Sequence, residues 1–424
     1  MGQILSQPVT KKEGESGENE RFVFSVSSMQ GWRISMEDAH AAVLSLSDDY
    51  NAAYFGVYDG HGGERMAKFA GEKTHTLLAE SDAFKQRDLV AAFTDAFLAT
   101  DAAMLEQYGE RGLDSSGCAA TAAVVTDDKI VCGNSGDSRT VLARRGIAKP
   151  LSFDHKPDNV GETSRIEAAG GFVEMSRVNG NLALSRALGD FTFKRNSHLP
   201  PEEQIVTAAP DTIEHIRDEN DEFLLLACDG IWDCMTSQQA VEFARKCIAE
   251  KVDLQEICEL MMEECLAPES DMSGIGCDNM TVCIVALLQE GQTKEQWYDM
   301  IADRVAKNDG PALDRSVETV KRMQHERHSH NVDQESVDES DDPGISTMDA
   351  SQIVQQLFGG DGVANLDAEA ASLLSRIGIK LHMENDQEQD DNGGVHEISE
   401  VSEENSQSKE SPDSHEIHEV EDAN

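Results

Sequence analysis

The segment Cys118-Ala-Ala-Thr-Ala-Ala-Val-Val-Thr126-Asp-Asp-Lys129-Ile-Val-Cys-Gly133 contains two short, mostly apolar runs separated only by Asp127 and Asp128. Such runs favour β-strands, and a connection this short is typical of a hairpin. A parallel pair would need a crossover of a dozen or more residues. The segment therefore predicts an antiparallel pair, and the linker between the runs 22–29 and 41–46 is also too short for a crossover.

The remaining chain up to about Leu288 alternates short strand-like runs with longer helical patterns. Consecutive strands interrupted by blocks of helices indicate the α+β class. We expect a central antiparallel β-sandwich flanked by helices on both faces, a four-layer αββα arrangement, and a doubly wound parallel sheet is the weaker alternative. The expected strands are 22–29, 41–46, 52–58, 118–126, 129–133, 140–143, 223–228 and 280–288, and the expected helices are 64–78, 88–105, 161–169, 237–249 and 254–266.

Changes in composition divide the chain into four predicted regions. Residues 1–21 are polar and predict a flexible N-terminal arm, and residues 22–290 predict one large folded domain. Residues 291–380 predict a partly helical accessory segment, in which residues 294–307 carry a helical apolar face with Trp297. Residues 381–424 predict an acidic disordered tail, because 15 acidic residues and one basic residue, Lys409, lie between Glu384 and Asn424.

Charge and cysteine content narrow the function classes. With 81 acidic and 35 basic residues the formal net charge is −46, which argues against nucleic acid and anionic lipid as partners. The nine cysteines include no Cys-x-x-Cys pair and indicate a reduced, intracellular protein. No run approaches the roughly 18 apolar residues of a membrane span. Gly2 and Ser6 fit the N-myristoylation pattern, which would give at most weak membrane association.

Carboxylates at the ends of apolar runs are the main candidates for chemistry. Asp59 and Asp229 each follow an apolar strand and precede glycine, Asp278 precedes another strand, and the pair Glu37-Asp38 precedes a fourth. Unpaired charges beside such strands are costly, and a bound cation would relieve that cost. Oxygen ligands without a Cys or His cluster favour Mg²⁺ or Mn²⁺ over zinc. Each Asp-Gly alone is also an ordinary turn.

Six short motifs carry a resemblance to a known family. In this order along the chain, they resemble the metal-dependent protein serine/threonine phosphatases of type 2C, over about Phe22 to Leu288, and the fungal members in particular. The motifs are Arg33-Ile-Ser-Met-Glu37-Asp38, Tyr58-Asp59-Gly60-His61-Gly62-Gly63, Asn134-Ser-Gly136-Asp137-Ser138-Arg139, Ala187-Leu-Gly189-Asp190, Cys228-Asp229-Gly230-Ile-Trp-Asp233 and Cys277-Asp278-Asn279-Met-Thr.

The resemblance implies a binuclear site with two Mg²⁺ or Mn²⁺ ions. By resemblance Asp59 would bridge the two ions, the Gly60 carbonyl would bind the first, and Asp229 and Asp278 would bind the second. Glu37 and Asp38 would hold metal-bound waters or touch a metal. Asp137 and Asp233, with Asp229, match positions that hold a weaker third ion in some relatives.

The resemblance also implies the reaction, which is hydrolysis of phosphoserine and phosphothreonine in proteins. Arg33 would grip the substrate phosphate, and a pair of cations lowers the pKa of a water that attacks phosphorus. His61 is the natural general acid for the leaving oxygen. A cysteine nucleophile is not expected, because no Cys is followed six positions later by Arg. Residues 165–193 match a variable flap that influences substrate choice.

Three other functions fit parts of the sequence. A catalytically silent phosphoprotein-binding module would share the fold, but Asp59, Asp229 and Asp278 are all present. An acidic protein that captures basic partners through its tail would not need the carboxylates at the strand ends. A two-metal hydrolase of small phosphoesters differs only in substrate. We expect phosphoprotein substrates that include protein kinases, a monomer, and a cytoplasmic and nuclear location.

Overall fold

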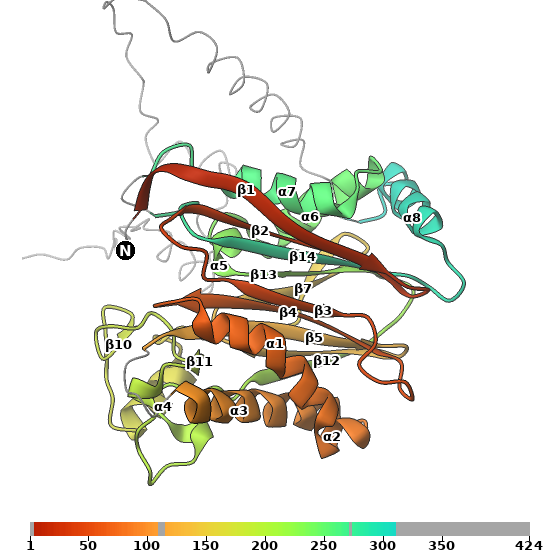
Figure 1. The fold of residues 1–424 in the computed structure, drawn as a ribbon. Coiled ribbons are helices and arrows are strands. Elements are labelled where there is room, and N and C mark those ends of the chain that lie inside the picture. Colours follow the sequence, from red (N-terminus) through yellow and green to blue (C-terminus); the bar gives the residue numbers. More distant parts are fainter. Residues whose placement is uncertain (1–3, 109–114, 271–273, 311–424) are drawn as a thin grey trace, which may run out of the picture. The chain divides into compact units, whose positions relative to one another are not determined.

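The computed structural model describes residues 4–108, 115–270 and 274–310, which belong to one compact unit. Two antiparallel sheets, each of six strands, lie face to face between two layers of helices (Figure 1). This confirms the predicted α+β class and the αββα layering. None of the described helices combines the length and apolarity needed to cross a bilayer.

The first sheet has the strand order β1-β2-β14-β13-β7-β8, and α6, α7 and α8 cover its outer face. Its strands alternate strictly: Phe223 and Leu225 pack under the helices, whereas Leu224 and Leu226 face the other sheet. The elements are β1 (Ile4–Glu18), β2 (Phe22–Arg33), β7 (Arg139–Arg144), β8 (Ile147–Pro150), β13 (Asp221–Ala227), β14 (Met280–Leu287), α6 (Ser237–Ala249), α7 (Leu254–Cys265) and α8 (Lys294–Ala306).

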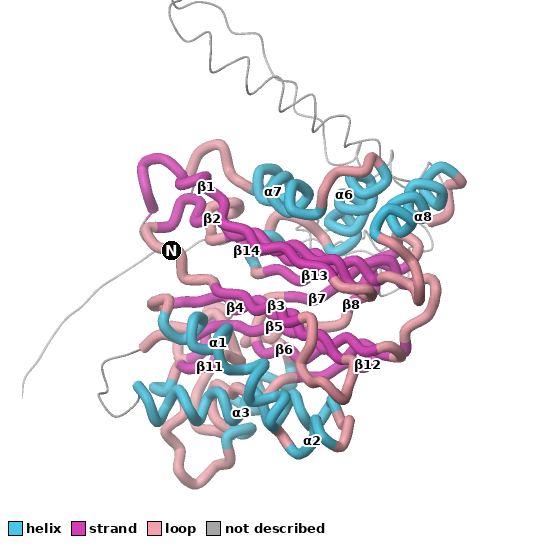
Figure 2. Tube along the Cα trace, turned by 45° about the vertical axis from the view of Figure 1, so that its right-hand side comes forward, coloured by secondary structure: helices cyan, strands magenta, loops and turns pink. Residues whose placement is uncertain are grey.

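The second sheet has the order β12-β6-β5-β4-β3, and α1 and α3 cover its outer face, as Figure 2 shows from a second angle. Tyr54 and Tyr58 of β4 pack under these helices, while Phe55 and Val57 face the first sheet. The elements are β3 (Ala39–Val43), β4 (Ala52–His61), β5 (Gly117–Thr126), β6 (Lys129–Ser135), β12 (Asp211–Ile216), α1 (Arg65–Glu80), α2 (Asp82–Lys85) and α3 (Leu89–Tyr108).

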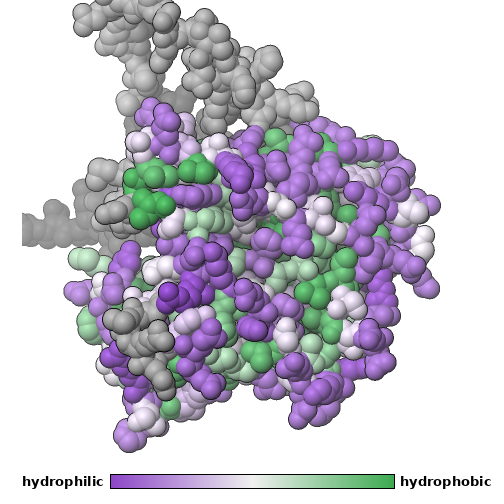
Figure 3. Space-filling view, viewed as in Figure 1, coloured by the Kyte–Doolittle hydropathy of each residue, from purple (hydrophilic) through white to green (hydrophobic). Residues whose placement is uncertain are grey.

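A segment beside the second sheet contains little regular structure. It holds two 3₁₀ turns and a hairpin whose two strands have two residues each. Another of its short strands, β11, pairs with β5. On the face drawn in Figure 3 the surface is mostly hydrophilic, as expected when apolar side chains fill the three layers between sheets and helices. The elements are α4 (Val160–Ala168), β9 (Val173–Glu174), β10 (Arg177–Val178) and β11 (Leu188–Gly189), whereas the short α5 (Asp229–Trp232) lies against β13 and β14 of the first sheet.

The prediction of a flexible arm over residues 1–21 is wrong, because Ile4–Glu18 forms β1 at the edge of the first sheet. Strand β1 pairs antiparallel with β2. Main-chain groups of an edge strand can pair with almost any sequence, so a polar segment suffices. Lys12 adds an ion pair with Glu263 of α7, 2.6 Å long, and a Cβ at Gly17 would lie only 2.7 Å from the Phe24 ring.

The predicted domain boundary at residue 290 is also wrong, because α8 packs into the same core as α6 and α7. Trp297 and Ile301 are fully buried there, and the Trp297 indole donates a 2.9 Å hydrogen bond to the carbonyl of Glu222 in β13. The apolar face predicted for this helix is therefore part of the main fold. The rest of the predicted accessory segment and the acidic tail, residues 311–424, lie outside the described residues.

Candidate metal and phosphate site

Two close backbone contacts bring the acidic motifs together at one end of the sandwich. A Cβ at Gly60 would lie 2.2 Å from the carbonyl oxygen of Glu37, and a Cβ at Gly230 would lie 2.0 Å from that of Asn279. Only glycine fits at either contact. The Asp59 segment therefore lies against the Glu37-Asp38 segment, and the Asp229 segment lies against the Asp278 segment.

The four aspartates of these segments form one cluster. Asp59 lies near the end of β4, Asp38 precedes β3, Asp229 follows β13 and Asp278 precedes β14. Carboxylate oxygens of Asp38 and Asp59 lie within 4.8 Å of each other and of the Cys228 sulfur. Asp229, Asp38 and Asp278 all act electrostatically on Asp59. The structure thus brings together residues from two sheets that are up to 240 positions apart, as 278 minus 38 shows.

Burial and mutual repulsion raise the pKa values of these carboxyls. The pKa of Asp59 lies well above its ordinary value because of burial first and the neighbouring aspartates second. Burial, then Asp137 and Asp278, raises the pKa of Asp229 in the same way. Burial raises the pKa of Asp38 to about 7, although Thr281 donates to its Oδ2 at 2.7 Å. The cluster is short of positive charge.

The donor set fits hard divalent cations. Asp38 Oδ1 is buried and has no hydrogen-bond partner among the described residues, so an acceptor points into the cluster unused. The carboxylates supply only oxygen, the preference of Mg²⁺ and Mn²⁺. The Cys228 sulfur lies close by, but burial raises the pKa of its thiol well above the ordinary value. It therefore stays a neutral neighbour.

Glu37 is held firmly at the rim of this cluster. Ser35 Oγ donates to one of its carboxylate oxygens at 2.8 Å, and the Gly63 N–H donates to the other at 2.9 Å. Its own N–H donates to Asn279 Oδ1, also at 2.9 Å. Glu37 is thus tied to both the Asp59 loop and the Asp278 loop.

The residues predicted for a third ion, Asp137 and Asp233, lie beside Asp229. Asp137 acts electrostatically on both Asp229 and Asp233, and burial is the main cause that raises the pKa of Asp233. The ammonium of Lys156 forms an ion pair with Asp137. A third cation at this position would therefore compete with a charge that the chain itself supplies.

Arg33 and His61 each pair with an aspartate. Arg33 Nη2 binds Asp278, and the Arg33 side chain remains 41% exposed. His61 Nε2 lies 2.7 Å from Oδ2 of the buried Asp190. Burial alone would lower the pKa of His61, but the Asp190 carboxylate outweighs it and raises this pKa. The sequence motif contained Asp190, but nothing in its spacing linked it to His61.

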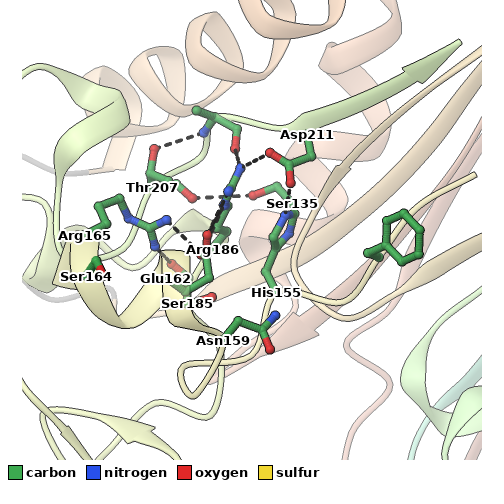
Figure 4. A network of polar contacts seen from close by, with 12 residues as sticks. Ser135, His155, Asn159, Glu162, Ser164, Arg165, Ser185, Arg186, Thr207 and Asp211 are labelled. Atoms are coloured by element: carbon green, nitrogen blue, oxygen red, sulfur yellow. Dashed lines mark hydrogen bonds and ion pairs between the residues drawn. The ribbon is translucent and has the colours of Figure 1, made fainter. Parts of the chain in front are cut away.

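A second polar network holds the flap segment next to this site (Figure 4). Glu162, 5% exposed, binds Arg165 at 2.8 Å and Arg186 at 2.7 Å. Arg186 also binds Asp211 at 2.7 Å, and Asp211 lies 3.0 Å from His155 Nε2. The other ring nitrogen of His155 accepts from the N–H of Gly136, the neighbour of Asp137. Sequence reasoning identified none of these network contacts.

A sandwich with carboxylates for divalent cations, a guanidinium and a histidine at one end defines a metal-dependent phosphoryl hydrolase. The protein phosphatase 2C family model matches residues 22–274. The chain is 54% identical over 321 residues to "Protein phosphatase 2C homolog 2" of Hypocrea jecorina, covering 73% of this chain and 72% of that protein. It is also 54% identical to "Protein phosphatase 2C homolog 3" of Schizosaccharomyces pombe, covering 73% and 75%.

A solved phosphatase structure from a pathogenic strain of Toxoplasma gondii shares the fold. Its TM-score is 0.57 at 27% identity, with 67% of this chain and 98% of that chain covered. The chain belongs to the protein phosphatase 2C family and is a metal-dependent protein serine/threonine phosphatase that resembles the fungal members. The predicted family and enzyme class are confirmed.

Proposed function

We propose that this phosphatase hydrolyses phosphoserine and phosphothreonine with two divalent cations, which Asp59, Asp229, Asp278 and the Gly60 carbonyl would hold. Glu37 and Asp38 would hold metal-bound waters or touch a metal directly. The observation that supports this most is the cluster of buried carboxylates, in which burial first and the neighbouring aspartates second raise the pKa values of Asp59 and Asp229. When bound, Mg²⁺ or Mn²⁺ would supply a water of lowered pKa and neutralise charge on the phosphoryl oxygens.

The chain's own groups would orient the substrate and protonate the leaving group. Arg33 uses one guanidinium nitrogen on Asp278 and can present its remaining N–H groups to a phosphate dianion. His61, whose pKa the Asp190 carboxylate raises against the effect of burial, keeps a proton more readily than a free imidazole and can donate it to the seryl or threonyl oxygen as that oxygen departs. Asp190 would keep the imidazole oriented.

The substrates we propose are signalling phosphoproteins that include protein kinases, met in the cytoplasm and nucleus by a monomeric enzyme. This rests on the resemblance to fungal phosphatases. Weak membrane association through acylated Gly2 is part of the same proposal, and Gly2 lies outside the described residues. An acidic protein offers no attraction to nucleic acid.

The decisive experiment measures phosphate release from a phosphothreonine peptide with and without Mn²⁺, for wild type and Asp59→Asn. We expect release by wild type only when Mn²⁺ is present, and almost none from the variant. Release without metal, or full activity of Asp59→Asn, would refute the two-cation mechanism.

A further inference from the structure

Two cysteines outside the catalytic groups lie side by side next to the carboxylate cluster. Cys234 comes directly after Asp233, and Cys265 is the last residue of α7. Cys234 Sγ lies 3.5 Å from the carbonyl oxygen of Cys265, and the two side chains also interact with each other. Thiols this close need only a small movement to reach disulfide geometry.

Access differs between the two thiols. Eight of the nine cysteines are buried, and Cys234 is the exception, being half-buried. A small oxidant can therefore reach Cys234 first, whereas Cys265 is buried next to it. A reactive cysteine that has a resolving partner is arranged in this way. The remaining cysteines are shielded by the core.

We propose that hydrogen peroxide converts Cys234 and Cys265 into an intramolecular disulfide, and that this bond weakens cation binding at the carboxylate site. The Cys234 sulfur attacks peroxide, an S–O bond forms, the O–O bond breaks and one water leaves. The Cys265 sulfur then attacks the Cys234 sulfur, the S–S bond forms, the S–O bond breaks and a second water leaves. Two thiols lose two electrons and two protons, and one peroxide becomes two waters.

The Cys234 sulfur touches both segments that carry the site. It donates to the Gly230 carbonyl at 3.5 Å, next to Asp229, and it accepts from the backbone of Gly276, two residues before Asp278. Gly276 itself packs closely on α7, because a Cβ there would lie 2.3 Å from the Cys265 carbonyl oxygen.

A disulfide would therefore disturb these contacts directly. An S–S bond is about 2 Å long, shorter than any contact between two unbonded thiols, so the two sulfurs must approach each other. That movement removes the Cys234 donor from the Gly230 carbonyl and pulls on the neighbouring Asp233. Displaced groups that only orient metal ligands cost roughly 10- to 100-fold in metal affinity. We expect a loss of about tenfold in Mn²⁺ affinity.

The test oxidises the metal-free full chain with a small excess of hydrogen peroxide, quenches with catalase, and maps disulfides by mass spectrometry without reduction. We expect one linked peptide pair, Cys234 with Cys265, that disappears on treatment with dithiothreitol. Linkage of other cysteines instead, or oxidation of Cys234 to a sulfinic acid without linkage, would overturn the proposal. This readout is independent of phosphatase activity.

Manganese binding to the same samples, by calorimetry, tests the second half. Oxidised wild type should bind Mn²⁺ about tenfold more weakly than reduced protein, and oxidised Cys234→Ser and Cys265→Ser should bind as their reduced forms do. Cys247→Ala, a control on α6, should respond like wild type. Unchanged Mn²⁺ affinity in linked wild type refutes the effect on the site. If reduced wild type binds no Mn²⁺, the proposed function fails, whereas the mapping still decides the linkage.

Discussion

Two acidic groups lie near each other at the same end of the molecule, and they differ in the charge around them. Asp59 and Asp229 face mainly other carboxylates, and burial followed by repulsion raises their pKa values. Glu162 is also buried, yet Arg186 and Arg165 outweigh burial and lower its pKa to about 2. The second group supplies its own cations, so it stabilises the flap. The first needs cations from solution, which is what makes it a site.

The largest expected effect is that of removing the central carboxylate. Asp59→Asn should lower phosphatase activity by at least about 100-fold, the upper end of the cost of losing a group that orients a metal ligand. In a chelator the same change should raise the melting temperature by roughly 2–4 °C, since a carboxyl with a raised pKa destabilises the metal-free fold at neutral pH. Thermal unfolding of both proteins in EDTA measures this rise in melting temperature, and the same measurement with Mn²⁺ shows whether the sign of the difference changes when cations are bound.

The control for this prediction is Asp158→Asn, which removes an exposed carboxylate. It should leave both activity and melting temperature unchanged. If Asp59→Asn melted lower than wild type in the chelator, repulsion within the cluster would not be the dominant interaction there.

The pair of His61 and Asp190 gives the next largest effect. His61→Ala should lower turnover of a phosphothreonine peptide by about 100-fold, the low end for loss of a general acid. Turnover of 4-nitrophenyl phosphate should fall far less, because that leaving group departs without a proton. Asp190→Asn should show the same substrate dependence at about tenfold, and Asn tolerates the left-handed backbone at this position, φ 52°.

The exposed His198 provides the matched control, and His198→Ala should behave like wild type with both substrates. Equal losses on the peptide and on 4-nitrophenyl phosphate would show that His61 acts in binding or folding and not as an acid.

Mutation of the second group, Glu162 with Arg165 and Arg186, should change the stability of the fold. Glu162→Gln should cost about 3 kcal/mol of unfolding free energy at pH 7, because it takes the carboxylate partner from the partly buried Arg165 and leaves Arg186 with Asp211 alone. A folded pKa of about 2 against an ordinary 4.5 means that the stabilisation is present above pH 4.5 and is lost as pH falls through 2. Urea unfolding at pH 7 and pH 3 should therefore show a smaller cost at the lower pH.

The neighbouring Glu167 on α4 is exposed, and Glu167→Gln should change stability by less than about 0.5 kcal/mol. A cost for Glu162→Gln that did not shrink at low pH would mean that packing, and not charge, holds the flap.

The sequence predicted the features that have a local pattern, namely apolar runs and aspartates at the ends of those runs. It missed the features that depend on tertiary contacts. Short apolar runs such as 223–228 located the inner strands, and aspartates at strand ends located the cluster. Strand β1 carried no such signal, since its stability comes from main-chain pairing with β2. The buried contact of Trp297 with Glu222 and the contact of Asp190 with His61 join residues far apart in sequence, which no local pattern reveals.

The smallest expected effect is that of deleting the acidic tail, which tests whether a high content of carboxylates by itself affects turnover. The tail predicted at 381–424 lies outside the described residues, yet between Glu384 and Asn424 it has 15 carboxylates, more than the site itself uses. Charges outside a fold act only through a long-range field that salt screens. Deleting residues 381–424 should therefore leave turnover of 4-nitrophenyl phosphate within about twofold at physiological salt. A tenfold fall would show that the tail takes part in the fold. The arrangement of the carboxylates in the cluster would then not be the whole difference between the site and the acidic tail.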